Sequence, residues 1–397
     1  MAARARVRLA LWVSASSGTL AAVRRFGLAC LLSVLGCAPV QSGAAPSESP
    51  AVATAQAPRE QVPPCAREGF SVGDPTTHGI APEAVQAFVA RAKAEHSTAL
   101  IIAVDGTIVV EEYFGQDPDR ATIAMSVTKS IVAVALGIAV AQGWLALDEP
   151  LAARVIPEWA STDKAAITLR HLLTQTSGLD PQRYAQVDGD WANGSIEAHA
   201  LTCAVTGEPG TSWVYNNNGI DLLSVVVRRA HPEHLYLDDF LQAGLFAELG
   251  VVGAYWIKDG HGMPRAAGEL VMRPIDLAKI GQLVLDEGRW NGEAVVDPAW
   301  VRQLVTPVDV ARFYGLSWWL RGDASDVRAW AANGYLGQHI VVVPQARVVA
   351  VRTRNPALVG AQEGVDEWND FAWDVLALVG EPVAEADRNA FARPRTP

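Results

Sequence analysis

A serine and a lysine stand three residues apart in an apolar stretch, and their spacing suits nucleophilic catalysis. In AMSVTKSIVAVALGIAVAQG, from Ala124 to Gly143, Lys129 is the only charged residue. We predict a buried helix with Ser126 in its first turn and Lys129 on the same face. Burial disfavours the charged form of a lysine, and a neutral amine can accept the serine proton. The N–H groups at a helix start favour the oxyanion that forms when the serine attacks a carbonyl.

A Ser-x-x-Lys pair arises by chance in many chains, so a further group must support it. The stretch WVYNNNG offers Tyr215 and, two residues on, Asn217, just before an apolar helix. The Tyr215 hydroxyl could relay the serine proton to the leaving group, and the Asn217 amide could hold the substrate carbonyl or Lys129. Taken alone, Tyr215 would be an ordinary core or loop tyrosine. Its combination with the serine and the lysine favours catalysis.

The elements around these motifs predict one sheet built from both ends of the chain. We expect strands, with a turn at Asp105-Gly106 between the first two, at residues 99–104, 107–114, 328–332, 338–343 and 347–354. We expect further helices at residues 82–95, 168–174, 217–229, 274–288 and 365–379. The predicted fold class is α+β: an antiparallel sheet flanked by helices, with an all-helical lobe inserted at about residues 145–252.

Four stretches, SVTKS, HLLTQTSGL, EPGTSWVYNNNG and GRWNG, resemble in order and spacing the serine beta-lactamase-related superfamily. It includes class C beta-lactamases, penicillin-binding carboxypeptidases, family VIII esterases and nylon-oligomer hydrolases. DGTIVVEEYFG followed by SVTKSI is most similar to the esterase and nylon-oligomer hydrolase branch. The resemblance covers about residues 69–380 and implies a beta-lactamase/transpeptidase-like fold.

The resemblance also implies roles for the motif residues. Ser126 would be the nucleophile that forms an acyl-enzyme, and Lys129 the base that activates it. Tyr215 would be the acid/base toward the leaving group, and Asn217 would support the substrate and the lysine. Lys129 and Tyr215 share one proton network, so either can be the base.

The third motif of the superfamily departs from its usual form. Lys-Thr-Gly is expected in AWAANGYLGQHIVVVP, where Ala332, Asn333 and Gly334 take its place, so the cation is lost. The resemblance implies a second oxyanion N–H at about Tyr335, and we expect Asn333, Gly334 and Tyr335 to bind substrate. His339 could supply a polar or positive group, but a histidine on an alternating strand is more often a wall residue. The lost lysine helps to hold the carboxylate of beta-lactams and D-alanyl peptides, so we expect neutral esters and amides to be better substrates.

Composition and charge limit the classes of partner. The chain has 397 residues, 50% of them hydrophobic, which is enough for a sizeable core. Its formal charge is -11, and the first 36 residues hold five arginines and no acid, so the remainder is more acidic still. We therefore expect no nucleic-acid partner. We also expect no cofactor and no metal, because His231 and His234 lack a third ligand nearby and His171 fits a structural position.

The N-terminus predicts export. Residues 1–37 fit a signal peptide, because Arg24 and Arg25 precede a short apolar run that ends in Val-Leu-Gly-Cys. This ending resembles a bacterial lipobox, which implies a lipid on Cys37. We expect a periplasmic or outer-membrane-anchored lipoprotein, and the alternative is a secreted protein.

Between the signal and the folded part, residues 38–64 are rich in Ala, Pro, Ser, Gln and Gly and predict a flexible tether. The hydrolase domain is expected at residues 65–397. Cys65 and Cys203 remain as an even pair in an oxidising compartment and could form a disulfide, although two unrelated thiols are equally compatible with the sequence.

These features predict an exported serine hydrolase that acts on a small-molecule ester, amide or peptide and meets a membrane only through its lipid anchor. One alternative is a beta-lactamase or D-alanyl-D-alanine carboxypeptidase. Another is a catalytically inactive relative that binds peptidoglycan. The presence of the serine, the lysine and the tyrosine argues against the inactive relative.

Overall fold

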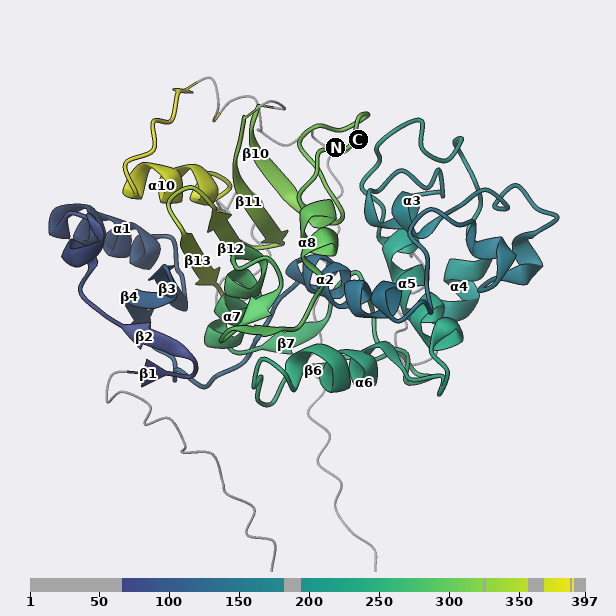
Figure 1. The fold of residues 1–397 in the computed structure, drawn as a ribbon, viewed down its shortest axis with the longest axis horizontal. Helices are drawn as coiled ribbons and strands as arrows, with labels where there is room; N and C mark the ends of the chain where they lie inside the picture. Colours follow the sequence, from purple (N-terminus) through teal and green to yellow (C-terminus); the bar gives the residue numbers. More distant parts are fainter. Residues whose placement is uncertain (1–65, 182–193, 324–325, 356–367, 386–387, 389–397) are drawn as a thin grey trace, which may run out of the picture. The chain divides into compact units, whose positions relative to one another are not determined.

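The central sheet of the computed structural model is assembled from both ends of the chain (Figure 1). The structure describes residues 66–181, 194–323, 326–355, 368–385 and 388. Eight strands follow the order β1-β2-β4-β3-β13-β12-β11-β10. They are β1 (Ala66–Arg67), β2 (Phe70–Val72), β3 (Ala99–Val104), β4 (Thr107–Tyr113), β10 (Trp319–Asp323), β11 (Asp326–Gly334), β12 (Gln338–Val343) and β13 (Val348–Thr353).

The strands that the sequence predicted are present. β3 and β4 form a hairpin around Asp105 and Gly106, whose φ angles of 47° and 73° suit a two-residue turn. β13 pairs with β3 and so joins the strands of the two chain ends. The predicted antiparallel sheet is confirmed, and one pair at its edge departs from it, because β2 runs parallel to β4. β2 has three residues and is too short to show a period in the sequence.

Helices cover both faces of the sheet (Figure 1). α1 (Pro82–Ala94) and α10 (Phe371–Leu378) share one apolar core with alternate residues of β3, such as Leu100. α2 (Val127–Ala141) and α7 (Pro274–Leu285) share the other core with the intervening residues, such as Ile101. Because both faces are covered, β3, β12 and β13 are buried along their whole length.

The predicted helical lobe lies between α2 and α7. Its described part contains α3 (Leu169–Leu173), α4 (Ile196–Thr202), α5 (Asn217–Ala230), α6 (Leu237–Leu241), the 3-10 turns η2 (Leu151–Ala153) and η3 (Pro157–Trp159), and the π-helical turn η4 (Gln242–Phe246). Thr168 caps α3 as predicted, because its side chain accepts the backbone N–H of His171 while His171 Nδ1 accepts that of Thr168. His171 is therefore part of a structural cap. Residues 182–193 of the predicted lobe lie outside the described residues.

Short elements that were not predicted hold the segments next to the candidate motifs. They are η1 (Pro75–His78), β5 (Thr122–Ile123), β6 (Tyr255–Trp256), β7 (Leu270–Met272), β8 (Arg289–Trp290), β9 (Glu293–Ala294) and α8 (Pro298–Leu304). β5, β7 and β6 form a small sheet. β5 ends just before Ser126, and β7 begins just after Ala267, so their pairing brings these two residues into one neighbourhood.

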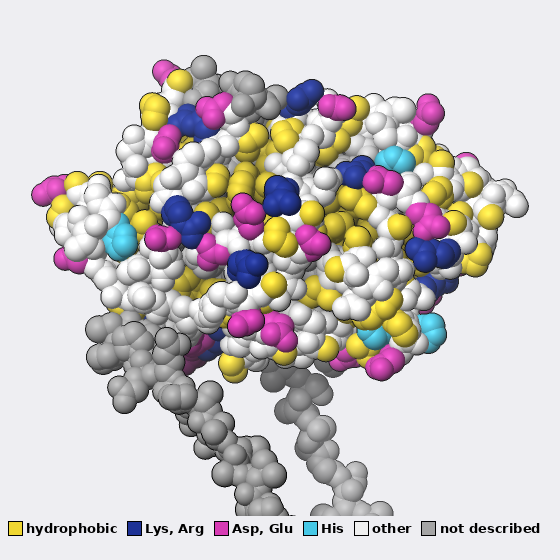
Figure 2. All heavy atoms as spheres, viewed as in Figure 1, with side chains coloured by type: hydrophobic (Ala, Val, Ile, Leu, Met, Phe, Trp, Pro, Cys, Tyr) yellow, Lys and Arg dark blue, Asp and Glu magenta, His cyan; other side chains and the backbone are white. Residues whose placement is uncertain are grey.

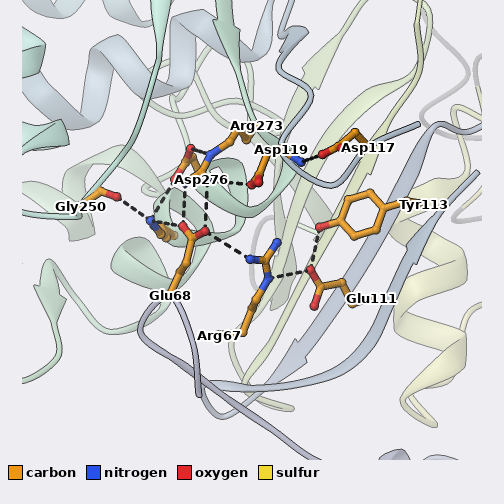
Figure 3. Close-up of polar contacts among 10 residues, drawn as sticks. Arg67, Glu68, Glu111, Tyr113, Asp117, Asp119, Gly250, Arg273 and Asp276 are labelled. Carbon is orange, nitrogen blue, oxygen red and sulfur yellow. Dashed lines mark hydrogen bonds and ion pairs between the residues drawn. The ribbon is translucent and has the colours of Figure 1, made fainter. Parts of the chain in front are cut away.

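A network of charges ties the first described strand to α7 (Figure 3). Glu68 follows β1 and accepts hydrogen bonds from Arg273 at 2.7 Å and from Lys279 at 3.1 Å. Asp276 lies 2.7 Å from Arg273 Nε and 2.9 Å from Lys279 Nζ. Asp119 lies 3.0 Å from Arg273. The network therefore joins segments more than 200 residues apart in sequence.

Acidic and basic side chains are interspersed on the face drawn in Figure 2. No helix among the described residues is long and apolar enough to cross a membrane. The expected signal, the lipidated Cys37, the tether and Cys65 lie outside the described residues.

Candidate active site

Ser126 stands at the turn that starts α2. The preceding residue, Met125, has a φ of 50°, so the chain bends sharply between β5 and the helix. The expectation that Ser126 lies in the first helical turn is wrong by one position, because it is the N-cap residue. Its side chain makes no capping hydrogen bond. The hydroxyl is instead 2.8 Å from Lys129 Nζ, so the structure brings the predicted pair together.

Lys129 is buried among uncharged groups. The residue is 2% exposed, and its Nζ donates to the backbone carbonyl of Ala267 at 2.6 Å. The same nitrogen lies 5.0 Å from the centre of the Tyr215 ring. Among the described residues, no carboxylate forms an ion pair with Lys129. A general base must lie within hydrogen-bond reach of the proton that it takes up, and Lys129 Nζ meets this requirement for the Ser126 hydroxyl.

The loop that follows α3 fixes Tyr215. Gln175 Oε1 accepts the backbone N–H of Asn216 at 2.7 Å, and Asn216 Nδ2 donates to the carbonyl of Leu179 at 2.7 Å. The Asn216 side chain also caps α5. Asn216 is buried and thereby holds Tyr215 and Asn217 on either side of it. Neither Gln175 nor Asn216 was predicted, although Gln175 lies within the HLLTQTSGL stretch that carried part of the resemblance.

Asn217 presents an acceptor that the protein itself does not use. Among the described residues, its Oδ1 is buried and has no hydrogen-bond partner. A buried polar atom without a partner is costly, so it marks a place where a ligand can pair. Lys129 Nζ donates to Ser126 and Ala267 instead, so the structure shows no hydrogen bond between Asn217 and the lysine. The sequence predicted that Asn217 supports both the substrate and Lys129. This oxygen favours the contact with the substrate.

The end of β11 lies against the segment that leads to Ser126. A Cβ on Gly334 would lie 2.6 Å from the carbonyl oxygen of Ala124, so only glycine allows this close approach. Tyr335 follows directly and is 51% exposed. This places the backbone of Gly334 and Tyr335 next to the start of α2, where the resemblance expects the second oxyanion donor.

Asn333 and His339 interact with each other across β11 and β12. His339 Nδ1 lies 3.1 Å from Asn333 Oδ1, and its ring stacks on Phe371 of α10 at 5.3 Å. His339 is 4% exposed. The histidine is thus a wall residue between the sheet and α10, and the Asn333 side chain already has a protein partner.

Arg273 and Arg354 are two arginines that could in principle replace the cation lost from the third motif. Ala332 is fully buried in the core that contains α2. Arg273 is held by three carboxylates, and Arg354 is fully buried. Arg273, held in this way, is not available to a substrate carboxylate.

The remaining candidates do not join the site. Cys203 is a free, buried thiol whose Sγ lies 3.4 Å from the carbonyl of Asp180. Its pairing with Cys65 stays a prediction, because Cys65 lies outside the described residues. His231 packs edge-on against Trp144. Among the described residues, no group of three His, Cys, Asp or Glu side chains is placed to hold a metal ion.

Comparison with known proteins defines the family. A model of the Beta-lactamase family matches residues 83–362, which is more than half of the chain. The chain therefore belongs to the beta-lactamase family. Together with the Ser126 and Lys129 geometry, this makes it a serine hydrolase of the beta-lactamase type.

Individual relatives cover different shares of the chain. An uncharacterized protein of Alkalihalophilus pseudofirmus is 26% identical over 66% of this chain and 83% of its own length. The esterase EstB of Burkholderia gladioli is 36% identical, but over 28% of this chain and 32% of EstB.

Solved structures with higher coverage show the same fold at low identity. EstCE1, described as a hydrolase with promiscuous acyltransferase activity, has a TM-score of 0.61 at 16% identity and covers 77% of this chain and 99% of its own. A penicillin-binding protein from Bacillus halodurans has a TM-score of 0.57 at 17% identity, with coverages of 75% and 99%. At such identities the likeness establishes the fold and leaves the substrate open.

Proposed function

We propose that the protein hydrolyses ester or amide bonds through an acyl-enzyme on Ser126. The 2.8 Å contact between the buried Lys129 Nζ and Ser126 Oγ carries the proposal. Neutral Lys129 accepts the hydroxyl proton, directly or with Tyr215 in the relay, as Oγ bonds to the substrate carbonyl carbon.

The steps that follow use the neighbouring groups. The carbonyl oxygen becomes an oxyanion beside the backbone N–H groups of Ser126 and Tyr335. Within the described part of the chain, the Ser126 N–H has no hydrogen-bond partner and is free for this purpose. The bond from the carbonyl carbon to the leaving oxygen or nitrogen then breaks, and Tyr215 passes a proton to that atom. Water then attacks the acyl carbon and gives one proton to the Lys129 and Tyr215 pair. The bond from that carbon to Ser126 Oγ breaks, the acid departs, and the proton taken from water passes to Oγ.

Labelling of Ser126 tests the nucleophile. A serine-reactive acylating inhibitor should add its mass to the wild-type protein, and Ser126→Ala should show no adduct and no turnover while its far-UV spectrum and melting temperature stay unchanged. Ser161→Ala, which removes an exposed serine of the helical lobe, serves as the matched control and should label like the wild type. Equal labelling of Ser126→Ala would refute the assignment.

For substrates, we propose small neutral esters and amides. The lost cation supports this choice, because a charge-assisted hydrogen bond to a substrate carboxylate contributes roughly 1.5–3 kcal/mol, about one to two decades in binding. Ala332 cannot supply it, and neutral substrates lose nothing by its absence. The esterase activity named for EstB and the hydrolase activity named for EstCE1 point in the same direction.

The competing functions are a beta-lactamase or D-alanyl-D-alanine carboxypeptidase and an inactive peptidoglycan-binding relative. The discriminating measurement is kcat/KM for a p-nitrophenyl short-chain ester against a chromogenic cephalosporin on one preparation. We expect the ester to be preferred. A clear preference for the cephalosporin would favour the first alternative, and no turnover of any ester, amide or beta-lactam would favour the second.

Export and lipid anchoring are part of the proposal. The supporting observation is the short apolar run that ends in Val-Leu-Gly-Cys at Cys37. The full-length protein should partition with membranes, and Cys37→Ala should release it or leave it unprocessed. A wild-type protein found entirely in the soluble periplasm or medium would remove the anchor.

A further inference from the structure

Four aromatic side chains gather around the proposed acid/base tyrosine, Tyr215. Two segments that are distant in sequence supply them: the loop before α5, and the loop before β10 together with the first residue of β10. The members of this aromatic cluster are Trp213, Tyr215, Phe313, Tyr314 and Trp319. The mechanism described above uses only Tyr215, so the other four rings need an explanation.

Three of the rings are nearly parallel. Trp319 stacks with Tyr215 at a centroid distance of 6.2 Å and an angle of 23°. Phe313 stacks with Trp319 at 6.2 Å and 19°. Trp319 therefore links Tyr215 to Phe313. The three nearly parallel rings form a series that starts at the proposed acid/base group.

The other two rings support this series. Trp213 meets Phe313 at 5.0 Å and Trp319 at 5.9 Å, edge to face in both cases. Tyr314 meets Trp319 at 5.0 Å and 85° and is almost fully buried. Edge-to-face contacts of this kind fix ring orientation. The parallel rings are thus held by packing that does not depend on a ligand.

The parallel rings are not fully covered by protein. Tyr215, Phe313 and Trp319 each remain partly exposed, while Tyr314 and Ala311 beside them are buried. Preorganised aromatic surface that stays open at a reaction centre suits a flat apolar ligand, which gains both burial and ring stacking there.

We propose that Trp319 and Phe313 form the binding surface for a flat, apolar leaving group. The proposal rests on the proposed function, in which Tyr215 hands a proton to the leaving atom. The leaving group must then lie next to Tyr215, and the parallel rings begin at that residue. The acyl group stays bonded to Ser126 after the leaving group departs, so the two halves of the substrate occupy different places.

Leaving-group selectivity tests this surface. We would compare 2-naphthylmethyl butyrate with ethyl butyrate, which form the same acyl-enzyme and differ only in the alcohol released. The ratio of their kcat/KM values reports steps up to acylation, and intrinsic reactivity cancels when variants are compared with the wild type.

Phe313→Ala is the main variant, because Phe313 stacks on Trp319, meets Trp213 edge to face and makes no ring contact with Tyr215 among the described residues. We expect the naphthylmethyl-to-ethyl ratio to fall about threefold to tenfold. Trp319→Ala should lower the ratio further and slow both esters, because Trp319 also stacks on Tyr215. Tyr255→Ala removes an exposed aromatic residue of β6 outside the cluster and should leave the ratio unchanged.

A binding measurement separates failure of this proposal from failure of the proposed function. Calorimetric titration of 2-naphthylmethanol into the Ser126→Ala protein needs no turnover, and Phe313→Ala in that background should weaken the binding about threefold to tenfold. If neither ester is turned over but the alcohol binds in this Phe313-dependent way, the acyl-enzyme proposal fails and the aromatic site stands. If the esters are turned over with an unchanged ratio in both variants, or the binding does not depend on Phe313, the aromatic site is refuted.

Discussion

Two lysines on neighbouring helices are buried to the same extent, yet their surroundings differ. Lys129 of α2 and Lys279 of α7 are 2% and 1% exposed, and both helices line the same apolar core. Lys279 meets Glu68 at 3.1 Å and Asp276 at 2.9 Å. Lys129 meets a hydroxyl, a backbone carbonyl and the face of a tyrosine ring. Burial is therefore common to both lysines. Within the described part of the chain they differ in their partners, which are carboxylates for Lys279 and uncharged groups for Lys129.

The two environments have opposite consequences for stability. Around Lys279, the carboxylates compensate for the loss of hydration, so removing the lysine leaves Glu68 and Asp276 to share Arg273 as their cation. Around Lys129, an ammonium would be desolvated without an ion pair in return. A residue that costs stability in this way is expected where reactivity requires it, as at the candidate site.

The largest expected effect is on activity and comes from Lys129→Met, which keeps the length of the side chain and removes the amine. We expect kcat/KM to fall by about 10²–10⁴, the usual contribution of a general base. The free energy of unfolding should stay the same or rise, because no ion pair is lost. Ester hydrolysis and urea unfolding of one preparation check both parts. Retained activity would contradict the role assigned to the lysine.

The reverse result is expected for Lys279→Met. The free energy of unfolding should fall by about 3–5 kcal/mol, because Asp276 would be left buried without one of its cations. Activity per folded molecule should remain, because Lys279 binds Glu68, Asp276 and the carbonyl of Gly250 and none of the candidate site residues.

A matched control for Lys279→Met is Lys258→Met, which breaks a surface pair with Asp238. It should cost no more than about 1 kcal/mol. If both variants lose the same free energy of unfolding, the buried α7 network stabilises the fold no more than a surface ion pair does. If Lys279→Met loses activity in its folded fraction, the two lysines are not functionally separate.

Of the two lysine environments, only that of Lys129 could be predicted from the sequence. Ser126 and Lys129 are one helical turn apart, and an uncharged stretch around a single lysine is visible in the sequence. The α7 network was not visible, because Glu68 is separated from Lys279 by 211 positions and each is an ordinary charge in its own segment. Pairing over such a distance depends on the sheet that joins the chain ends.

The same limit applies within the site. The serine, lysine and tyrosine were predicted from residue type and spacing, and the structure brings all three together. Ala267 was not predicted, because it acts through its backbone carbonyl, which any residue can supply. The small strands next to it have two or three residues, too few to show a period. Long periodic elements such as α5 and β12 were predicted within a residue or two of their bounds.

The smallest expected effect concerns the pH dependence of the α7 network. Burial by itself raises the pKa of Glu68, but hydrogen bonds from Arg273 and Lys279 outweigh burial, so the pKa is lowered. A carboxyl with a lowered pKa in the folded state contributes stability that is present above its unfolded pKa and is lost as the pH falls toward the folded value. That loss should occur below about pH 5, given an ordinary glutamate pKa of about 4.3. Glu68→Gln should therefore be less stable than the wild type at neutral pH, and the two free energies of unfolding should converge as the pH falls.

The effect is modest because Glu68 is partly exposed, and added salt should reduce it further. Urea unfolding at a series of pH values measures it, with Glu83→Gln, at an exposed glutamate of α1, as the control. A constant difference between the wild type and Glu68→Gln across this pH range would show that the Glu68 carboxylate does not stabilise α7 through its charge.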